Sequence, residues 1–403
     1  MKILHVIASV DPMWGGPIEG VFRFAEAWKK LGYVREIVSL DSPDDPCVSA
    51  CPVNVHAVGI RGQYLCKWRN TIPWMRYRYT PHLVPWLRQN VRNYDAVIVN
   101  GLWNYVSFGT WRSIVGGRVP YFVYAHGMLD PWFNTAYPLK RVIKQIVWWI
   151  EEKRVLRDAK AVLFTSEEER TLARKAFWPY RANEEVVGYG TKYPSGDPQI
   201  EIETFRGVLP ALGGRRFLLF LSRIHPKKGC DLLIRAFARV ARAYPDIDLV
   251  IAGPDQVGLS RELKGLAHQL GIDKRIHWPG MLFGDAKWGA FRTCDAFVLP
   301  SHSENFGIAI VEALGCAKPV LITDKVNIWR EVLESCAGLV CTDTDDSVHD
   351  MLVRFLRLPE QEILALGENA RQCFLNKFEI DRAADRLLAV LTRYVKVHAG
   401  TQR

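Results

Sequence analysis

The sequence lacks any apolar run that approaches the roughly 20 residues needed to span a membrane. The longest candidate, "VIKQIVWWI", is short and has charged residues on both sides. The nine cysteines also lack a zinc pattern, because the closest pairs (Cys47 with Cys51, Cys336 with Cys341) have no further ligands at the usual spacing. We therefore expect neither a transmembrane helix nor a zinc module. Unpatterned cysteines in a large chain favour a reduced, cytoplasmic location.

Two motifs of cofactor chemistry are missing as well. No GxGxxG fingerprint follows the first apolar run, so a nicotinamide dinucleotide is not implied. No Asp-x-Asp pair follows a strand end, since "SPDD" and "DTDD" lie in loop-like stretches. We accordingly expect no cofactor and no required metal. The N-terminal "MKILHVIASVD" is broken by His5 and stopped by Asp11, which is typical of a first strand rather than a signal peptide.

Positive charge, in contrast, is in excess. The 403 residues contain 53 Lys and Arg against 43 Asp and Glu, which gives a formal net charge of +10 and a pI near 9.1. This balance favours anionic partners, and leaves nucleic acid, an anionic membrane face and phosphorylated small molecules open. With 49% hydrophobic and 24% charged residues, the composition is that of an ordinary globular protein.

Short apolar runs alternate with longer amphipathic ones along the whole chain. Runs such as "KILHVIAS", "DAVIVNGL" and "PYFVYAHG" precede residue 190, and "RFLLFLSR", "IDLVIAGP" and "CDAFVLPS" follow residue 210. Fully apolar strands between helices predict a parallel sheet covered on both faces, and two such series predict two doubly wound α/β domains. Because "GYGTKYPSGDPQ" reads as a linker, we expect domains over 1–195 and 196–378. A C-terminal helix over 379–403 is expected to cross back to the first domain.

Ligands of doubly wound domains bind at the carboxyl ends of strands, so functional residues are expected in the loops that follow the strand runs. Gly15 and Gly16 precede a proline in "SVDPMWGGPIEG", where backbone N–H groups can approach an anion closely. Arg223 and Lys228 lie in "LSRIHPKKGC", where two cations can clamp a diphosphate. An ordinary strand–helix turn and a solvated basic loop, respectively, are the alternatives.

The stretch "SHSENFGIAIVEALG" places two glutamates, Glu304 and Glu312, at and within an apolar helix. Carboxylates there suit neutral, hydroxyl-rich groups such as a sugar and a ribose. The backbone N–H groups of Asn305, Phe306 and Gly307 would face the same ligand. In the alternative, Ser301-x-x-Glu304 is a capping box and Glu312 lies on the solvated side of the helix.

In this order, "SRIHPKKG", "IAGP" and "LPSHSENFGIAIVEALGCAKPVLITD" closely resemble family 4 of the retaining glycosyltransferases. The family pattern G-R-x4-K-G, then P-S-x-x-E-x-F-G-x4-E-A, then G-x-P-V is matched at nearly every position. The resemblance is strong over residues 217–325 and less sharp before residue 190. It implies the GT-B architecture, two doubly wound domains facing each other across a cleft, with the acceptor bound by the N-terminal domain and a nucleotide sugar by the C-terminal one.

By this resemblance, Arg223 and Lys228 hold the diphosphate of the donor, Glu304 contacts hydroxyls of the transferred sugar, and Glu312 contacts the ribose. His126, at the end of "YFVYAHG", matches the family's histidine facing the donor sugar. A satisfied structural histidine is the alternative for that residue.

Gly15 and Gly16 match the glycine loop where donor phosphate and acceptor meet in the family. Three departures are apparent. The first loop carries Asp11, Met13 and Trp14, which are not generic, so we expect acceptor recognition to be particular to this protein. "KVNIWRE" stands where many members have a glycine-rich turn, so the family's donor contacts of that loop are not carried over. "GYGTKYP" stands where the family has Asn-Gly.

The expected function is retaining, metal-independent transfer of a sugar, expected to be a hexosyl group, from a nucleotide-diphosphate sugar to a saccharide or lipid-linked acceptor. The expected setting is cell-surface polysaccharide or glycolipid biosynthesis. Same-face attack is favoured over a covalent intermediate, because no carboxylate nucleophile is evident near His126. A sugar-nucleotide epimerase or hydrolase of the same architecture and a non-catalytic nucleotide-sugar-binding subunit are the alternatives.

Residues 61–94 contain many Arg, Lys, Trp and Tyr and no acidic residue. Basic residues interleaved with aromatics suit an anionic membrane interface, and the helix-like "LKRVIKQIVWWIEEKRVLRDA" can assist. We expect peripheral docking on the inner face of a membrane. A mixed core with a solvated face is the alternative. Nucleic acid is not expected as a partner, because no segment resembles a nucleic-acid module.

Overall fold

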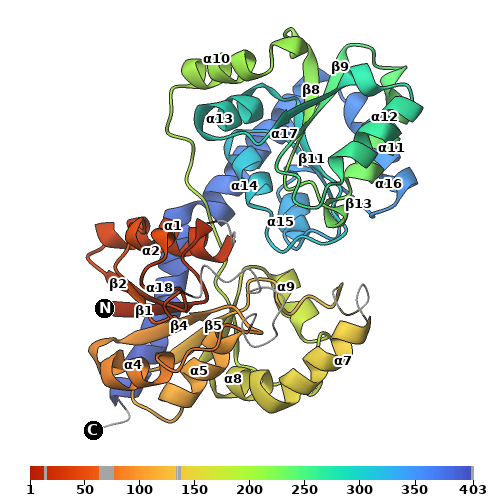
Figure 1. The fold of residues 1–403 in the computed structure, drawn as a ribbon. Helices are drawn as coiled ribbons and strands as arrows, with labels where there is room; N and C mark the ends of the chain where they lie inside the picture. Colours follow the sequence, from red (N-terminus) through yellow and green to blue (C-terminus); the bar gives the residue numbers. More distant parts are fainter. Residues whose placement is uncertain (13–15, 63–76, 133, 135–137, 401–403) are drawn as a thin grey trace. The chain divides into compact units, whose positions relative to one another are not determined.

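The computed structural model describes residues 1–12, 16–62, 77–132, 134 and 138–400, and it divides into two compact units (Figure 1). Unit 1 comprises Met1–Tyr189 and Ile380–Arg403, and unit 2 comprises Gly190–Glu379. The C-terminal helix is therefore part of the N-terminal unit. In the described part of the chain, no helix combines the length and the apolarity that crossing a membrane requires.

Unit 1 contains a seven-stranded sheet in the order β3-β2-β1-β4-β5-β6-β7, and every described strand pair is parallel. The strands are β1 (Lys2–Ile7), β2 (Val34–Ser39), β3 (Val55–Ala57), β4 (Ala96–Asn100), β5 (Tyr121–Tyr124), β6 (Ala161–Phe164) and β7 (Glu184–Val186). The helices are α1 (Gly16–Lys30), α2 (Pro46–Ser49), α4 (Leu83–Asn90), α5 (Tyr105–Ile114), α7 (Pro138–Val147), α8 (Lys153–Asp158), α9 (Glu167–Ala173) and α18 (Ile380–Gly400).

Both faces of this sheet are buried, as its uninterrupted apolar runs predict. Leu4 and Val6 of β1 pack in one core with residues of α4, α5 and α8, whereas Ile7 packs with Ile18 and Val21 of α1. Figure 1 shows α1 and α18 over one face and α4, α5 and α8 over the other. The strand that the sequence did not predict is β7, an edge strand of three residues that includes two glutamates.

The C-terminal helix is tied to α1 inside unit 1. The indole Nε1 of Trp28 donates to the carbonyl of Ala384 at 3.0 Å, and Leu387 and Leu391 of α18 are buried. Next to it, the hydroxyl of Tyr189 donates to the carbonyl of Gly16 at 2.9 Å. This ring occupies the space of a side chain at Gly20, where a Cβ would lie 1.6 Å from the hydroxyl oxygen. Tyr189 thus fixes the first turns of α1.

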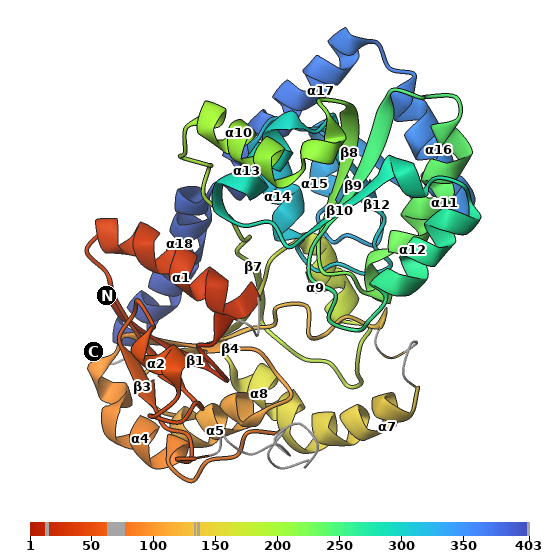
Figure 2. The ribbon, with the colours of Figure 1, turned by 45° about the horizontal axis from the view of Figure 1, so that its top comes forward.

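Unit 2 contains a six-stranded parallel sheet in the order β10-β9-β8-β11-β12-β13. Figure 2 shows α11 (Cys230–Ala241), α12 (Ser260–Gln269) and α16 (Asp345–Leu356) together on one face of the sheet. The strands are β8 (Arg216–Leu221), β9 (Ile247–Ala252), β10 (Ile276–Gly280), β11 (Ala296–Leu299), β12 (Val320–Thr323) and β13 (Gly338–Cys341). The helices are α10 (Pro198–Val208), α11 (Cys230–Ala241), α12 (Ser260–Gln269), α13 (Gly284–Thr293), α14 (Ile308–Gly315), α15 (Trp329–Glu334), α16 (Asp345–Leu356) and α17 (Glu360–Cys373).

One carboxyl group in the core of unit 1 is not neutralised by a cation. Glu152 lies in the π-helical turn η4 (Trp148–Glu152) between α7 and α8 and is fully buried. Its Oε1 accepts from the Trp103 N–H at 2.6 Å and from the Ser107 hydroxyl at 2.9 Å, but its Oε2 has no hydrogen-bond partner. Burial raises the pKa of Glu152 to about 7.

This raised pKa predicts a pH-dependent stability. The folded state holds the proton of Glu152 more tightly than the unfolded state, so the stability from this group is lost as the pH rises from about 4.5 to about 7. Glu152→Gln stays neutral and keeps an acceptor for Trp103 and Ser107. We expect it to raise the melting temperature of unit 1 at pH 8, measured by circular dichroism. At pH 5, where the carboxyl is protonated, the variant should gain nothing, and an equal gain at both pH values would contradict this account.

Candidate functional site

The loop after β8 carries the two predicted cations of unit 2. Arg223 is exposed, whereas Lys228 ends the short 3-10 turn η6 (Pro226–Lys228) and is 5% exposed. Gly229 follows with a φ of 66°, in the left-handed region that favours glycine. A Cβ at Gly229 would lie 2.0 Å from the carbonyl oxygen of Pro300 at the end of β11. Glycine is therefore required for the β8 loop to lie against the β11 loop.

Hydrogen bonds hold these two loops together. The carbonyl of Lys227 accepts from the backbone N–H of His302 at 2.8 Å and from the hydroxyl of Ser301 at 2.9 Å. Segments that lie more than 70 residues apart in sequence thus meet at neighbouring strand ends. The sequence motifs predicted this proximity, because parallel strands end at the same edge of a sheet.

Lys228 and Glu304 form an ion pair between these loops. Only 6% of the Lys228 side chain and 18% of the Glu304 side chain are exposed. Burial raises the pKa of Glu304, but the charge of Lys228, with further contributions from Lys227 and Arg223, outweighs it and leaves the pKa below its ordinary value. Glu304 is therefore a charged acceptor surrounded by cations. Two of the predicted site residues are in direct contact, and Arg223 is close enough to act on the same carboxylate.

The loop after β12 holds the backbone of Glu304. The N–H of Glu304 donates to the carbonyl of Lys325, and its carbonyl accepts from the N–H of Asn327, both at 2.9 Å. The amide of Asn327 also donates to Oδ1 of Asn305 at 3.1 Å. The "KVNIWRE" segment, in which the sequence departs from the family pattern, thus positions the glutamate loop. Asn327 is 4% exposed and was not identified from the sequence.

Residues 305–307 form the turn that leads into α14. Gly307 has a φ of 71° and precedes the first helical residue, Ile308. The ring of Phe306 is buried and packs edge-on against Phe378, with 5.7 Å between ring centroids. The capping-box alternative is therefore wrong: Ser301 donates to the carbonyl of Ser303, and the helix begins well after Glu304.

Glu312 lies in the second turn of α14 and is 4% exposed, so its placement on a solvated helix face is also wrong. Its Oε1 accepts from Nζ of Lys287 on α13 at 2.9 Å. The same ammonium lies 4.1 Å from the ring centroid of Trp288, which adds a cation–π contact. Lys287 was missed in the sequence because it lies mid-helix, away from any strand end or motif.

The turn after β9 completes the loops at this edge of unit 2. The N–H of Ile224 donates to the carbonyl of Pro254 at 2.9 Å, which places Arg223 beside "IAGPD". The Asp255 carboxylate accepts from four consecutive backbone N–H groups over residues 257–260, and these bonds lower its pKa. Arg223 lies 3.5 Å from Oε1 of Gln256. Its guanidinium is thus exposed at the same edge as Lys228.

In unit 1, His126 follows β5 in a backbone conformation that non-glycine residues seldom adopt. Its φ is 49°, and that of Gly127 is 75°. The N–H of Gly127 donates to Oε1 of Glu169 at 2.5 Å, and the other oxygen of Glu169 accepts from the N–H and hydroxyl of Thr165. The His126 ring stacks on Tyr124 with 4.3 Å between centroids. The turn holds the imidazole in one orientation.

A chain of polar side chains leads away from His126 into the core. Its Nε2 lies 3.3 Å from Oδ1 of Asn100 at the end of β4, and the amide of Asn100 lies 3.1 Å from Nδ1 of His5. Nε2 of His5 accepts from Arg35 at 2.7 Å, because a guanidinium can only donate. Burial lowers the pKa of His126 to about 3, and that of His5 also lies well below its ordinary value. Asn100 could have been found from its place after the run "DAVIVN".

The remaining predicted residues of unit 1 are the two glycines. Gly16 is the first residue of α1 and is exposed, in agreement with the helix start that Pro17 predicts. Gly15 lies outside the described residues, as do Met13, Trp14 and residues 63–76 of the basic and aromatic segment over 61–94.

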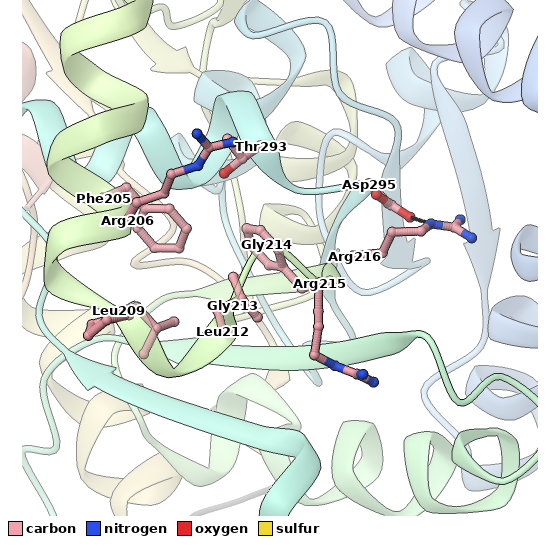
Figure 3. Close-up of a pocket in the computed structure, with 12 residues that line it drawn as sticks. Phe205, Arg206, Leu209, Leu212, Gly213, Gly214, Arg215, Arg216, Thr293 and Asp295 are labelled. Carbon is pink, nitrogen blue, oxygen red and sulfur yellow. Dashed lines mark hydrogen bonds and ion pairs between the residues drawn. The ribbon is translucent and has the colours of Figure 1, made fainter.

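One hollow of unit 2 lies away from these loops. It has a volume of about 390 Å³ and opens beside the start of β8, where Arg216 pairs with Asp295 (Figure 3). Phe205 and Arg206 of α10 line another side of it. Because this is the amino end of β8, the hollow is at the sheet edge opposite to Arg223, Lys228 and Glu304, and it is not part of the candidate site.

The environment of His126 predicts that its ring stays neutral at physiological pH. Burial disfavours the imidazolium and lowers the pKa of His126 to about 3, so the ring should be neutral from pH 5 to pH 8. The side-chain NMR signals of His126, assigned by their loss in His126→Gln, should not move between pH 5 and pH 8. A titration midpoint near pH 6.5 would contradict the buried, neutral imidazole.

Comparisons with known proteins agree with this arrangement. A family model described as "Glycosyl transferase 4-like domain" matches residues 15–190, and one described as "Glycosyl transferases group 1" matches residues 201–373. A D-inositol 3-phosphate glycosyltransferase of Frankia alni is 34% identical over 193 residues, which is 43% of this chain and 47% of that protein. A relative from Gordonia bronchialis with the same name is 28% identical over 66% of this chain and 58% of that protein. The chain spans about half the length of the curated relatives it matches.

Two solved structures are similar over nearly the whole chain. Anabaena Alr3699/HepE, in complex with UDP and glucose, has a TM-score of 0.74 at 18% identity and covers 98% of this chain and 100% of that one. WaaG, a glycosyltransferase involved in lipopolysaccharide biosynthesis, has a TM-score of 0.69 at 15% identity and covers 97% and 100%. These likenesses confirm the predicted fold class, two doubly wound parallel-sheet domains of the GT-B type. With the two family models together matching most of its length, the chain belongs to the family 4, group 1 glycosyltransferases.

Proposed function

We propose that this protein is a retaining glycosyltransferase that moves a sugar from a nucleotide-diphosphate sugar to a saccharide or lipid-linked acceptor. The observation that carries the proposal is the Lys228–Glu304 pair, held between neighbouring strand ends of unit 2 with Arg223 at the same edge. A cation and a carboxylate in one place suit a ligand that has both phosphates and hydroxyl groups.

Sugar transfer requires stabilisation of the leaving nucleoside diphosphate, because negative charge grows on its phosphates as the glycosidic bond breaks. Fixed cations do this without reorganising at the moment of reaction. Lys228 is buried and anchored, so its ammonium is held in place, and the exposed Arg223 supplies a planar fork for phosphate oxygens. In this role, the two residues stabilise the departing diphosphate.

The carboxylates are assigned to hydroxyl groups, following the family resemblance. Glu304 stays ionised, which suits an acceptor of sugar hydroxyls, and Glu312 is assigned to the ribose. The backbone of Asn305, Phe306 and Gly307 lies at the positive end of α14, where it favours an anionic ligand.

The neutral His126 is assigned to the transferred sugar, and Gly15 and Gly16 to the loop at the donor phosphate. For retention we favour same-face attack of the acceptor on an ion pair. The carboxylate beside His126, Glu169, is 3% exposed and bonds with both oxygens to backbone and hydroxyl groups, so it is not placed as a nucleophile.

The proposal extends to a cytoplasmic enzyme of cell-surface polysaccharide or glycolipid biosynthesis that docks peripherally on the inner face of a membrane. Eight described cysteines are free, which agrees with a reducing compartment. Lipid-linked acceptors favour such docking, because the saccharide then stays at the membrane surface.

Titration calorimetry against UDP-, GDP- and ADP-sugars, followed by product analysis with a lipid-linked or saccharide acceptor, tests this function. Transfer with the anomeric configuration kept is the expected result. An epimerised nucleotide sugar or free sugar as the sole product would instead favour the epimerase or hydrolase reading. Binding without turnover toward any acceptor would favour a non-catalytic subunit.

The role of Lys228 can be isolated with a matched neighbour. Lys228→Ala should lower kcat by about two orders of magnitude or more, because one fixed cation at a developing anion has that effect. Lys227→Ala removes the same charge from the same loop but keeps the backbone carbonyl that binds His302 and Ser301. We expect a much smaller loss for it. Full activity of Lys228→Ala would contradict the assignment of Lys228 to the donor diphosphate.

Metal independence gives a separate prediction. One group of potential ligands in the described residues, Asp41, Asp45 and Cys47, has its ligand atoms within 4.8 Å of one another. Asp41, however, already accepts from the Ser9 hydroxyl and the Val10 N–H and pairs with Arg78. Enzyme treated with EDTA should therefore keep its transfer rate. Loss of activity that Mg²⁺ or Mn²⁺ restores would contradict this expectation.

A further inference from the structure

The helix α7 turns its apolar side toward solvent. Leu139, Val142, Ile143 and Ile146 of α7 and Ile150 of the following turn η4 recur at helical spacing and are 85%, 61%, 64%, 47% and 55% exposed. With Trp149 at their border they are called the α7 face below. On the opposite side of the same helical stretch, Trp148 is fully buried. No residue of α7 itself is buried.

Contiguous exposed apolar side chains on a globular protein are typical of an interaction site. The contrast with α11 makes the point: its apolar residues, such as Leu233 and Phe237, are fully buried against the sheet of unit 2. Both helices have the period of an amphipathic helix, but only α7 presents its apolar side outward. The helix is short and has several charges, so it suits the plane of a membrane interface and not a span.

Positive charge gathers on one side of the α7 face. Beside it is a hollow of about 670 Å³ between α7 and the segment after α9, lined by four cations: Arg141, Arg174, Lys175 and Arg181. Among its lining residues that the structure describes, the one carboxylate, Glu184, is paired with Arg174. The hollow therefore keeps an excess of positive charge, which suits the phosphates of anionic headgroups.

Tryptophan links the apolar face to the basic hollow. The indole Nε1 of Trp149 donates to the carbonyl of Trp178 at 2.8 Å, and the side-chain amide of Gln145 donates to the same carbonyl at 2.6 Å. Trp178 is itself 74% exposed. Indole rings are enriched at the boundary between acyl chains and headgroups. The two tryptophans mark that boundary between the apolar and the basic parts of the surface.

We propose that the α7 face enters an anionic phospholipid bilayer at the boundary between headgroups and acyl chains, while Arg141, Lys175 and Arg181 contact lipid phosphates. This inference rests on the proposed peripheral membrane contact and assigns it to one surface and one lipid chemistry. It places the docking surface on α7 and residues 174–181, whereas the sequence pointed first to residues 61–94. It does not depend on the transfer reaction.

The test is flotation of the full chain with vesicles of phosphatidylcholine alone or with about one third phosphatidylglycerol. The wild type should float with the anionic vesicles, and less so as the salt concentration rises. Val142→Gln/Ile143→Gln/Ile146→Gln should weaken vesicle binding by roughly tenfold or more. Its control, Ile200→Gln/Leu333→Gln/Leu364→Gln, removes three exposed but scattered apolar side chains from unit 2 and should bind as the wild type does.

The basic part is tested in the same way. Arg141→Gln/Lys175→Gln/Arg181→Gln should lose the preference for anionic vesicles. Arg242→Gln/Arg261→Gln/Lys274→Gln, which takes the same charge from exposed positions of unit 2, should keep it. Circular dichroism and titration of UDP into each variant check that folding and donor binding are intact.

The outcomes separate this inference from the proposals it rests on. Wild-type flotation that survives the α7 changes would overturn the assigned surface and leave the membrane contact standing. No flotation of the wild type would overturn both. A wild-type dimer in light scattering that the α7 changes convert to a monomer, without any flotation, would assign the face to a second copy of the chain. None of these results bears on UDP binding, which reports on the transferase proposal alone.

Discussion

The site of unit 2 depends on one ion pair that has been withdrawn from solvent. Placing an ammonium and a carboxylate in a largely buried position is costly, and their mutual attraction seldom does more than offset that cost. Two apolar side chains of similar volume would hold these loops at least as well. The Lys228–Glu304 pair is thus better explained by what it presents than by the stability it adds. The loops supply the stability through backbone hydrogen bonds and through Gly229, which allows the close approach to Pro300.

In unit 1, the site candidate is uncharged, in contrast to the ion pair of unit 2. Burial keeps this candidate, His126, uncharged. A left-handed turn orients the ring, and Glu169 holds this turn by accepting from the N–H of Gly127. A neutral imidazole can donate and accept hydrogen bonds at once, whereas an imidazolium can only donate. The chain Asn100–His5–Arg35 behind it places a buried guanidinium near, but not next to, the ring. Unit 2 therefore presents fixed charges, and unit 1 presents a polar group without charge.

Much of this could be predicted from the sequence, for a physical reason. Short, fully apolar runs between amphipathic segments favour central strands of a covered parallel sheet, and such strands end at a common edge. Loop residues such as Lys228 and Glu304 were found because they follow those runs directly. Residues that act through tertiary packing could not be predicted in this way. Lys287 reaches Glu312 from the middle of α13, and Asn327 supports Glu304 from a loop that departs from the family pattern.

The same limit explains why the sequence could not place the docking surface. Periodicity fixes which side of a helix is apolar, but not whether that side meets a core or solvent, and α7 and α11 give the two answers in one chain. Whether the apolar side of a helix is buried depends on which helices already cover the two faces of the sheet. In unit 1, α4, α5 and α8 already bury one face of the sheet against Leu4, Val6, Val97 and Val99. In the described part of the chain no residue of α7 is buried, so its apolar stripe stays exposed.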